Sequence, residues 1–590
     1  MRFIGLLARS GPTGQAARRG LEARFARSRF EKVVHSQNGL LLLAEQRLPR
    51  VVSSDGRILL GLAFDATGTS ARPSDLCGLD VEGLLGRYWG PCVAIAPCRG
   101  PAGATYARFE IARDPSGGLS CYIAKTPAGV YLTSDLSLAL KAGMPAPGID
   151  WAVLAEDIVY RRARGVRTCL SGLDELVPGA AATVGSENAA TRLFWDPWLV
   201  QDRALSRSSL DRAASVLRAR IDLCAATLAG CFERPALELS GGLDSSIVAA
   251  ALAGHRGLST VHCISPGPEG DERDYARAVA AAFDLPIDEH LLAIEGFDPM
   301  AVSEPCLPRP GRPGVLGSAH RVVQRHCRAL GADAVFNGAG GDSVFCSLNT
   351  PAPVADRFRA CGPGLGFLRS LGDLSDRHNV SIWTTARMTF RSIRRTFDPD
   401  RGAATLFIAS EARPERRDLH PWLAAAPPRA LLGHSLHIEA IAFILGYIDG
   451  QGRSATVPTI SPLLSRPVLE ACLSLPAWRW IEGGRDRAVA RFAYRHRLPA
   501  RVVERRSKGG VDHYVTGVFE RNRAAVRDAL LGGLLAQAGL IDRRALEAAL
   551  ATGHSSHAHR LLELADAEAW ARAWTRTAAA SPTAQDDAPP

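Results

Sequence analysis

Lysine is scarce in this chain. Of its 70 basic residues only four are lysine, namely Lys32, Lys125, Lys141 and Lys508, and the other 66 are arginine. Lys508 is the only lysine after position 141. Because arginine serves as almost every ordinary solvated cation here, an isolated lysine is a candidate for a specific role.

Long apolar runs and paired cysteines are also missing. No window of about 18 uncharged apolar residues occurs, which excludes a transmembrane helix. The first apolar run is short and ends at Arg9, so no secretory signal is expected. The 13 cysteines are scattered singly without a C-x-x-C pair, which gives no spacing for a zinc site or a disulfide framework. We expect a cytoplasmic protein with reduced thiols.

The net charge of +10 does not predict nucleic-acid binding. Residues 1–35 hold eight basic and two acidic side chains, so +6 of the total lies in this stretch. The rest of the chain is nearly balanced and has no basic block of the size that nucleic acid requires. We therefore expect neither a nucleic acid nor a membrane as partner.

The apolar content, 46% of 590 residues, is sufficient for more than one domain. Residues 1–195 contain short apolar runs between turn residues, which predicts a β-rich domain. Residues 196–207 are polar and are expected to be a linker. Over residues 208–575 helical patterns alternate with short β-branched runs, which predicts an α/β domain with a doubly wound parallel sheet and a helical C-terminal part. Residues 576–590 are predicted to be a disordered tail.

The most informative segment is Leu237–Val248, which contains the string S-G-G-x-D-S between a predicted strand and a predicted helix. Glycines allow a tight turn close to a ligand, and a helix N-terminus attracts phosphate. An aspartate in such a loop would repel phosphate unless it binds Mg²⁺, which makes Asp244 a predicted metal ligand. The residues predicted to bind the nucleotide here are Leu239, Ser240, Gly241, Gly242, Asp244, Ser245 and Ser246.

A second glycine-rich loop, Phe336–Ser343, follows another predicted strand. The carboxyl ends of parallel strands lie at the same edge of a sheet. We therefore expect Asp342 to face Asp244 across the nucleotide and to hold the same Mg²⁺, with Gly340 beside the nucleotide.

Together the two loops resemble the asparagine synthetase family, which includes β-lactam synthetase and the lasso-peptide cyclases. The first loop differs from a Walker loop because it has no lysine. The resemblance covers residues 55–515 and includes Arg113–Gly117, Pro462–Leu464 and Arg506–Gly510. It implies a ligase that uses ATP and Mg²⁺ to turn a carboxylate into an acyl-adenylate, which an amine then attacks with release of AMP. For the first domain it implies a glutaminase-like fold of the N-terminal-nucleophile type.

The chain departs from the glutamine-dependent members of this family at the residues that act on glutamine. Those members carry a cysteine directly after the initiator methionine, where the terminal amine assists the thiolate. Here Arg2 stands at that position and the first cysteine is Cys77. The glutamine-binding N-G-E stretch is replaced by Gly61–Asp65. We therefore expect no glutaminase activity and an amine that the substrate itself carries.

Four stretches are most similar to the lasso-peptide cyclases, namely Leu85–Gly90, Arg113–Gly118, Pro462–Pro476 and Arg505–Gly510. These cyclases join the N-terminal amine of a precursor peptide to an Asp or Glu side chain. The resemblance thus implies a precursor-peptide substrate and a leader-peptide-binding or leader-protease partner. The alternative is an ammonia-dependent asparagine synthetase or a β-lactam-synthetase-like ligase for small molecules.

Two further readings are less favoured. A tRNA-modifying enzyme with this loop would be expected to carry cysteine sets, which the chain lacks. A non-catalytic scaffold would be expected to have lost Asp244 or Asp342, and both are present.

Lys508 is the candidate for stabilising negative charge during attack of the amine, because a compact ammonium fits beside a tetrahedral centre. The alternative is a solvated surface lysine. The general base is harder to identify, since Pro458 stands where ring-closing family members have a carboxylate. Glu439 is the nearest candidate, followed by Tyr447 and Asp449, although a structural role is favoured for each of them over a catalytic one.

Overall fold

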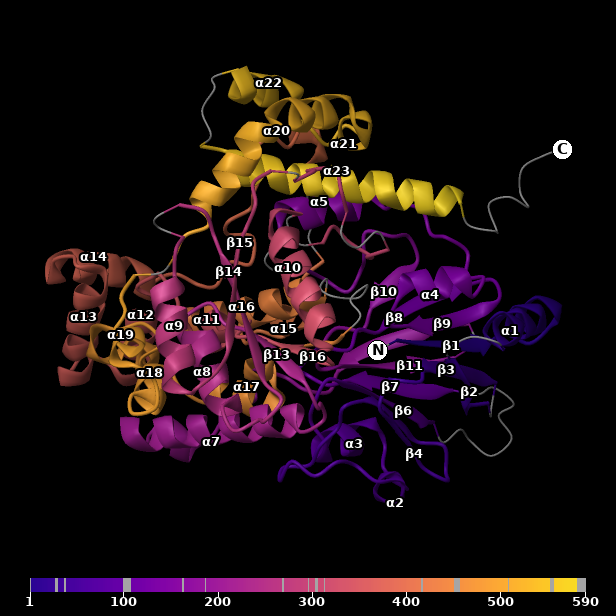
Figure 1. The fold of residues 1–590 in the computed structure, drawn as a ribbon, viewed down its shortest axis with the longest axis horizontal. Coiled ribbons are helices and arrows are strands. Elements are labelled where there is room, and N and C mark those ends of the chain that lie inside the picture. Colours follow the sequence, from indigo (N-terminus) through magenta and orange to yellow (C-terminus); the bar gives the residue numbers. More distant parts are fainter. Residues whose placement is uncertain are drawn as a thin grey trace.

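The computed structural model describes residues 2–580 except for a set of short segments. These segments are residues 27–29, 37–38, 99–107, 162–163, 186, 268–269, 296, 303–305, 312–313, 415–417, 450–456, 508 and 552–555. The described chain forms an N-terminal sandwich of two sheets, a parallel sheet with its helices, and a group of C-terminal helices (Figure 1).

Two antiparallel sheets lie face to face in the N-terminal part. Neighbouring residues of a strand point to opposite faces of its sheet. Phe3 therefore joins the core between the two sheets with Val93, whereas Ile4 packs under the outer helices. Within the described residues the first sheet has the order β10 (Leu173–Glu175), β8 (Tyr122–Thr126), β9 (Gly129–Thr133), β1 (Phe3–Ala8), β3 (Leu40–Glu45) and β2 (Phe30–His35). The second has the order β12 (Ala189–Leu193), β11 (Ala180–Val184), β7 (Phe109–Arg113), β6 (Cys92–Pro97), β5 (Ile58–Gly61) and β4 (Arg50–Val52).

Helices cover the outer faces of this sandwich. The first sheet is covered by α1 (Pro12–Phe25), α4 (Leu136–Lys141) and α5 (Trp151–Val159), and the second by α2 (Pro73–Leu76) and α3 (Val81–Arg87). The layers thus run helix, sheet, sheet, helix, which confirms the predicted β-rich α+β domain. Arg2 stands directly before β1 and forms ion pairs with Glu45 and Asp135.

The second part is built on a parallel sheet. Within the described residues its order is β15 (Ile287–Leu291), β14 (Ser259–Ile264), β13 (Pro235–Glu238), β16 (Ala334–Phe336) and β17 (Thr459–Ile460). The chain winds outward from β13 to β15 and then returns to the other side of β13 as β16. Ligands bind at the carboxyl ends of the strands where the order reverses in this way. The loops after β13 and β16 therefore flank the expected crevice.

Helices lie on both faces of this sheet. On β13, Ala236 packs toward α10 (Gly314–Leu330), whereas the next residue, Leu237, packs toward α8 (Leu243–Leu252). The predicted doubly wound arrangement is thereby confirmed. The face of α8 also carries α7 (Leu210–Ala229), α9 (Arg273–Ala282), α16 (Leu432–Asp449), α17 (Arg466–Leu473) and α18 (Ala488–Tyr494). A three-helix projection follows from α12 (Ala352–Cys361), α13 (Leu365–His378) and α14 (Ile382–Ile393), at the left of Figure 1.

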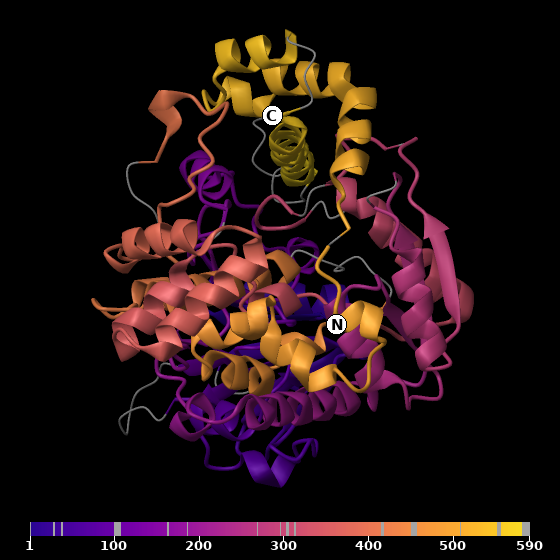
Figure 2. The ribbon, with the colours of Figure 1, turned by 90° about the vertical axis from the view of Figure 1, so that its left-hand side faces the viewer.

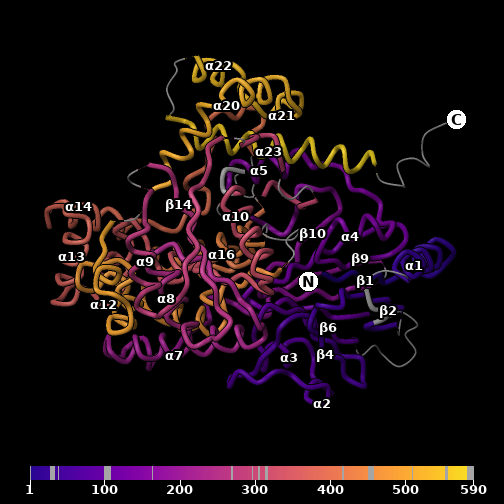
Figure 3. Tube along the Cα trace, in the orientation of Figure 1, coloured from indigo at the N-terminus to yellow at the C-terminus, as the bar shows by residue number. Residues whose placement is uncertain are grey.

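The C-terminal helices α20 (Asp512–Gly532), α21 (Leu534–Gln537), α22 (Arg543–Ala551) and α23 (Ala558–Ala579) lie together at the top of Figure 2. In Figure 3 the long α23 runs back over α5, and Arg560 Nη1 donates to the carbonyl of Ile158 at 3.2 Å. Trp574 Nε1 likewise donates to the carbonyl of Pro147 at 2.9 Å. The C-terminal helix therefore joins the second part of the chain to the first.

Two of the predicted boundary segments contain helical residues. Residue 576, the predicted start of the tail, lies inside α23. This helix continues to Ala579 and is anchored by the buried side chains of Trp570 and Trp574. Residues 581–590 lie outside the described residues. The linker predicted at 196–207 contains the short helix α6 (Arg203–Ser206), and the domain boundaries stay a prediction. None of the described helices is both long and apolar enough to span a bilayer.

Candidate active site

The first glycine-rich loop connects β13 to α8. Leu239 follows the strand, residues 240–242 form the turn, and α8 begins at Leu243. Gly241 has a φ of 78°, and a Cβ atom there would lie 2.5 Å from the backbone nitrogen of Ala276, so that only glycine fits. The turn places the N-terminus of α8 at the carboxyl edge of the sheet, which is an arrangement that binds phosphate.

The three predicted serines of this loop have different surroundings. The Oγ atoms of Ser240 and Ser245 lie 2.9 Å apart, and the Ser240 N–H donates to Ser245 Oγ at 3.2 Å. Both residues line a cavity of about 350 Å³. Ser246 is fully buried, and its hydroxyl donates to the carbonyl of Gly242 at 2.7 Å. Ser246 therefore supports the loop from within rather than facing the cavity.

The second loop, between β16 and α11 (Gly341–Val344), lies directly against the first. A Cβ atom at Gly341 would overlap the side chain of Asp244, and one at Gly338 would overlap the backbone of Ser245. Gly340, which was predicted to lie beside the nucleotide, does not line the cavity. It has a φ of 93° directly before α11, and a Cβ atom there would overlap the side chain of Leu464. The two loops can approach this closely because glycine occupies their points of contact.

The two predicted metal ligands meet at a single arginine. Arg487 Nη1 lies 3.1 Å from Asp244 Oδ1, 3.2 Å from Asp244 Oδ2 and 2.7 Å from Asp342 Oδ1. Its Nε donates to Asp486 Oδ2 at 2.7 Å. The aspartates predicted to face each other across the nucleotide thus do converge, and a guanidinium stands between them.

The electrostatics of Arg487 reflect this position. Its side chain is 11% exposed, and burial by itself would lower the pKa of the guanidinium. The nearby carboxylates Asp244, Asp342 and Asp486 outweigh burial and raise the pKa overall. Arg487 also has a φ of 53°, a conformation that residues other than glycine seldom adopt. The backbone is therefore held in a strained form while its side chain is held by three carboxylates.

The carboxylate pair suits a Mg²⁺ ion. Mg²⁺ prefers oxygen ligands and is usually bound through one or two carboxylates together with substrate phosphates. Oxygens of Asp244 and Asp342 already lie within 3.2 Å of one cationic nitrogen, and Asp342 is 42% exposed on the solvent side. The two side chains are therefore placed to share a cation, and a Mg²⁺ ion there would offset negative charge on the phosphates.

The cavity lies at the carboxyl edge of the parallel sheet. Its wall includes residues of the first loop, of β14, of the loop after β16, of the start of α18 and of the segment that follows α18. Among them are Leu239, Asp244, Cys263, Asn337, Arg487 and Arg491. Arg491 donates to Asp486 Oδ1 at 2.8 Å and to the carbonyl of Val503 at 2.7 Å. The cavity thus combines hydroxyl groups, carboxylates and guanidinium groups, which suits a nucleoside triphosphate and its metal ion.

Lys508 lies outside the described residues, but both of its flanks lie at the cavity. Glu272 Oε1 is 2.6 Å from Arg505 Nη1 and accepts from the Gly509 N–H at 3.1 Å. The Arg505 guanidinium also lies over the ring of Tyr275, at 3.9 Å from its centroid. Glu272 and Ser507 line the cavity. The segment that carries Lys508 is therefore tied to the cavity wall on both sides.

The candidates for the general base lie elsewhere. Glu439 is a buried residue of α16 and does not line the cavity, so its role stays a prediction. Asp449, at the end of α16, accepts from Arg113 Nη2 at 2.6 Å and serves the contact between the two domains. Tyr447 stacks on Phe443 with ring centroids 6.0 Å apart.

Sequence reasoning assigned no role to Arg487. Its neighbourhood, residues 484–491, is part of the family resemblance, but 66 arginines make a single one inconspicuous. The sequence also gives no indication that Glu272, at the head of α9, contacts Arg505 and Gly509, because these contacts form only in the fold.

A comparison with models of protein families finds a match over the second part of the chain. The family model described as asparagine synthase matches residues 231–574. This range includes both glycine-rich loops, the residues of the cavity and all but the last turn of the C-terminal helices. Among the curated proteins, none matches the chain significantly.

Proposed function

Because the chain belongs to the asparagine synthase family of ATP-dependent ligases, we propose that it is a macrolactam cyclase acting on a precursor peptide. In this proposal a side-chain carboxylate of the peptide attacks the α-phosphorus of ATP, forming an acyl-adenylate and pyrophosphate. The N-terminal amine of the same peptide then attacks the activated carbonyl, and AMP leaves. The observation that carries the proposal is the convergence of Asp244, Asp342 and Arg487 beside the serine-lined end of α8.

Each group has a task in this scheme. Ser240 and Ser245 with the N-terminus of α8 would hold the pyrophosphate. Asp244 and Asp342 would hold Mg²⁺, and Lys508 would stabilise the charge that develops as the amine attacks. Glu439 stays the predicted general base.

The amine is proposed to come from the substrate rather than from glutamine. Arg2 stands at the position of the family's nucleophilic cysteine, and it is paired with Glu45 and Asp135. Residues 61–65 replace the glutamine-binding stretch. In this proposal the N-terminal sandwich supports the second domain without making ammonia.

A substrate larger than an amino acid is supported by a second cavity. It has a volume of about 530 Å³, lies between α13 and α18, and shares Arg491 with the first cavity. Beyond it the helices α13 and α14 expose apolar side chains, including Leu365 (87% exposed) and Trp383 (81% exposed). Large exposed apolar side chains on two helices that contact each other are typical of an interaction surface. A peptide that spans both cavities and this surface accounts for the arrangement better than a free amino acid.

The test is a mass measurement of the product. The full-length protein is incubated with ATP, Mg²⁺ and a candidate precursor peptide encoded beside its gene, with the matching leader-binding or leader-protease protein where one is encoded. The expected product has lost one water, and AMP forms in equal amount. Parallel reactions contain aspartate with ammonia, aspartate with glutamine, and small amino diacids.

The outcomes separate the candidates. Formation of asparagine from ammonia, with every peptide left uncyclised, would replace the cyclase by the ammonia-dependent synthetase. Formation of asparagine from glutamine would contradict the proposed loss of glutaminase activity. A cyclised small molecule would support the β-lactam-synthetase-like alternative.

A further inference from the structure

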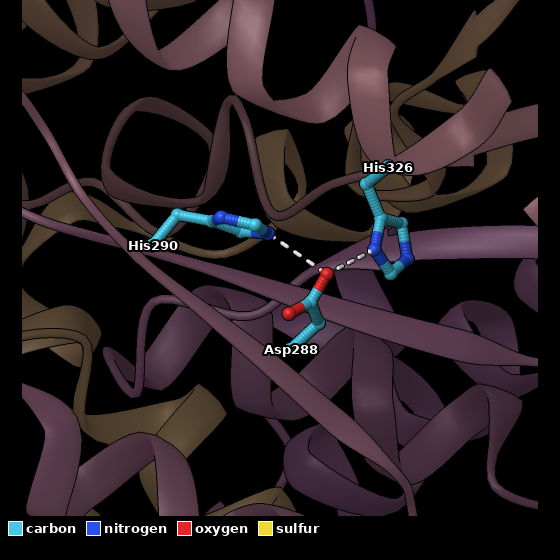
Figure 4. A group of neighbouring side chains, drawn as sticks. All are labelled: Asp288, His290 and His326. Carbon is cyan, nitrogen blue, oxygen red and sulfur yellow. Dashed lines mark hydrogen bonds and ion pairs between the residues drawn. The ribbon is translucent and has the colours of Figure 1, made fainter. Parts of the chain in front are cut away.

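Two histidines and an aspartate meet between β15 and α10, apart from the residues of the ATP cavity. Asp288 and His290 belong to β15, the edge strand of the parallel sheet, and His326 belongs to α10 (Figure 4). Residues two apart on a strand point to the same face, so Asp288 and His290 share one face. Figure 4 shows all three side chains converging on one point.

The distances are close to those of a shared metal ion. Asp288 Oδ2 lies 2.8 Å from His290 Nε2 and 2.9 Å from His326 Nδ1, and the three ligand atoms all lie within 4.8 Å of one another. Ligands at the usual zinc distances in tetrahedral geometry stand about 3.3 Å apart. Small side-chain movements would therefore bring the three atoms to bonding distance from one ion.

The buried histidine of the three, His326, has a further contact that would fix the orientation of its ring. The His326 side chain is 2% exposed, and its other ring nitrogen, Nε2, lies 3.3 Å from Ser259 Oγ on β14. If Nδ1 binds a metal, Nε2 carries the proton and can donate it to the serine hydroxyl. Metal-bound histidines are commonly oriented through such a bond to the second nitrogen.

The side away from His326 is open to an entering ion. Asp288 is 50% exposed and His290 is 36% exposed. Two imidazoles and one carboxylate with an open position form a ligand set typical of Zn²⁺ and related transition metals. Mg²⁺ prefers oxygen ligands alone, so this site differs chemically from the pair Asp244 and Asp342.

We propose that Asp288, His290 and His326 form a site for a divalent transition-metal ion of the Zn²⁺ class, which links β15 to α10. The site lies one strand away from the ATP cavity, because His290 is paired in register with Cys263, a residue of the cavity wall. A bound ion would hold the edge strand to the helix that covers it. Binding of this ion is independent of the proposed ligase reaction.

The experiment measures Zn²⁺ binding by the full-length protein without nucleotide or peptide. After removal of metals with a chelator, zinc chloride is titrated calorimetrically into the wild type and into the variants Asp288→Asn, His290→Ala and His326→Ala. The matched control is His559→Ala, which removes an exposed histidine paired with a single aspartate, Asp512, at 2.9 Å. We expect one site that each of the three variants weakens at least tenfold and that the control leaves unchanged.

A second readout separates this site from the cysteines. Cobalt replaces zinc, and its absorption spectrum is expected to show nitrogen and oxygen ligation without a thiolate charge-transfer band. Equal zinc binding by wild type and His290→Ala, no binding at all, or a thiolate band would each overturn the proposal. His290 is partly exposed, so its variant stays informative even if replacement of the buried His326 prevents folding. Since ATP takes no part, failure here leaves the cyclase proposal unaffected.

Discussion

Arg113 and Asp449 form a buried ion pair between residues 336 positions apart. Arg113 Nη2 donates to both carboxylate oxygens of Asp449, at 2.7 and 2.6 Å. Arg113 is the last residue of β7 in the N-terminal sandwich, and Asp449 is the last residue of α16 in the second domain. Burial by itself would lower the pKa of Arg113, but Asp449 and Glu175 raise it overall. The arginine of the family-like stretch 113–117 therefore joins the two domains.

Breaking this pair is expected to destabilise the protein strongly. Asp449→Asn removes the nearer of the two carboxylates that compensate a fully buried guanidinium, and such changes cost about 3 kcal/mol of unfolding free energy. The midpoint of urea unfolding, followed by tryptophan fluorescence, measures the loss. The control is Asp528→Asn, which breaks the exposed pair of Arg527 and Asp528 and is expected to change nothing measurable. Equal midpoints for both variants would contradict the role of Asp449.

Because the two glycine-rich loops are in close contact, adding one methyl group at Gly341 is expected to lower activity strongly. Gly341→Ala places a Cβ atom in the space of the Asp244 side chain and displaces that carboxylate from Arg487. We expect the ATP–pyrophosphate exchange rate to fall at least tenfold, in line with the sensitivity of catalysis to small misplacements. Gly372→Ala on α13 is the control, because nothing lies within 4 Å of its Cβ position. An unchanged exchange rate in Gly341→Ala would show that the reaction does not depend on the placement of the Asp244 carboxylate beside Arg487.

Lys508→Ala tests the amine step. An ammonium about 4 Å from an oxyanion contributes on the order of 4 kcal/mol at an effective dielectric near 20, which corresponds to roughly a thousandfold in rate. We expect product formation to fall by about this factor while ATP–pyrophosphate exchange is largely kept. Lys141→Ala, at an exposed lysine of α4, serves as control. Unchanged turnover would remove Lys508 from the active site.

Arg487→Gln is expected to change the Mg²⁺ dependence. The variant removes the cation that Asp244 and Asp342 share, so the two carboxylates should bind Mg²⁺ more tightly. We expect the Mg²⁺ concentration for half-maximal ATP–pyrophosphate exchange to fall severalfold, while the maximal rate falls because a phosphate-facing positive charge is lost. The conservative variant Arg487→Lys should have a half-maximal Mg²⁺ concentration between those of the wild type and Arg487→Gln. If the half-maximal concentration is the same in all three proteins, Arg487 does not compete with the metal.

The buried carboxyl of Asp356 is expected to make the protein less stable as the pH rises. Burial raises the pKa of this α12 carboxyl to about 7, and backbone N–H groups of Gly433 and His434 lower it only in part. Between about pH 4 and pH 7 the folded state therefore keeps a proton on Asp356 that the unfolded chain has lost. The stabilising contribution of this protonated carboxyl is lost as the pH rises through this window, so the free energy of unfolding falls.

The variant Asp356→Asn has no such proton to lose. Its stability relative to the wild type should rise from pH 4.5 to pH 7, by up to about 1.4 kcal/mol per pH unit. His434, whose pKa burial lowers to about 4, acts with the opposite sign, but it is present in both proteins and cancels in the comparison. Thermal midpoints across this range measure the difference. Parallel curves for the two proteins would contradict the raised pKa of Asp356.

Much of the fold could be predicted because it depends on local patterns. The strand, glycine turn and helix of residues 235–252 follow from neighbours in the sequence, and so does the alternation that buries both faces of β13. The expectation that Asp342 faces Asp244 needed only the rule that parallel strands end at one edge. Ser246 is the exception within the loop, since its neighbours could not show that its hydroxyl turns back to the carbonyl of Gly242.

The sequence by itself determined the class of fold, the two loops and the family to which the chain belongs, because each rests on short motifs with their own geometry. Only the tertiary structure decided that Arg487 stands between Asp244 and Asp342, and that Asp288 and His290 meet His326. These contacts join residues that packing brings together from distant elements. No local periodicity encodes them, because each depends on how whole helices and sheets pack against one another.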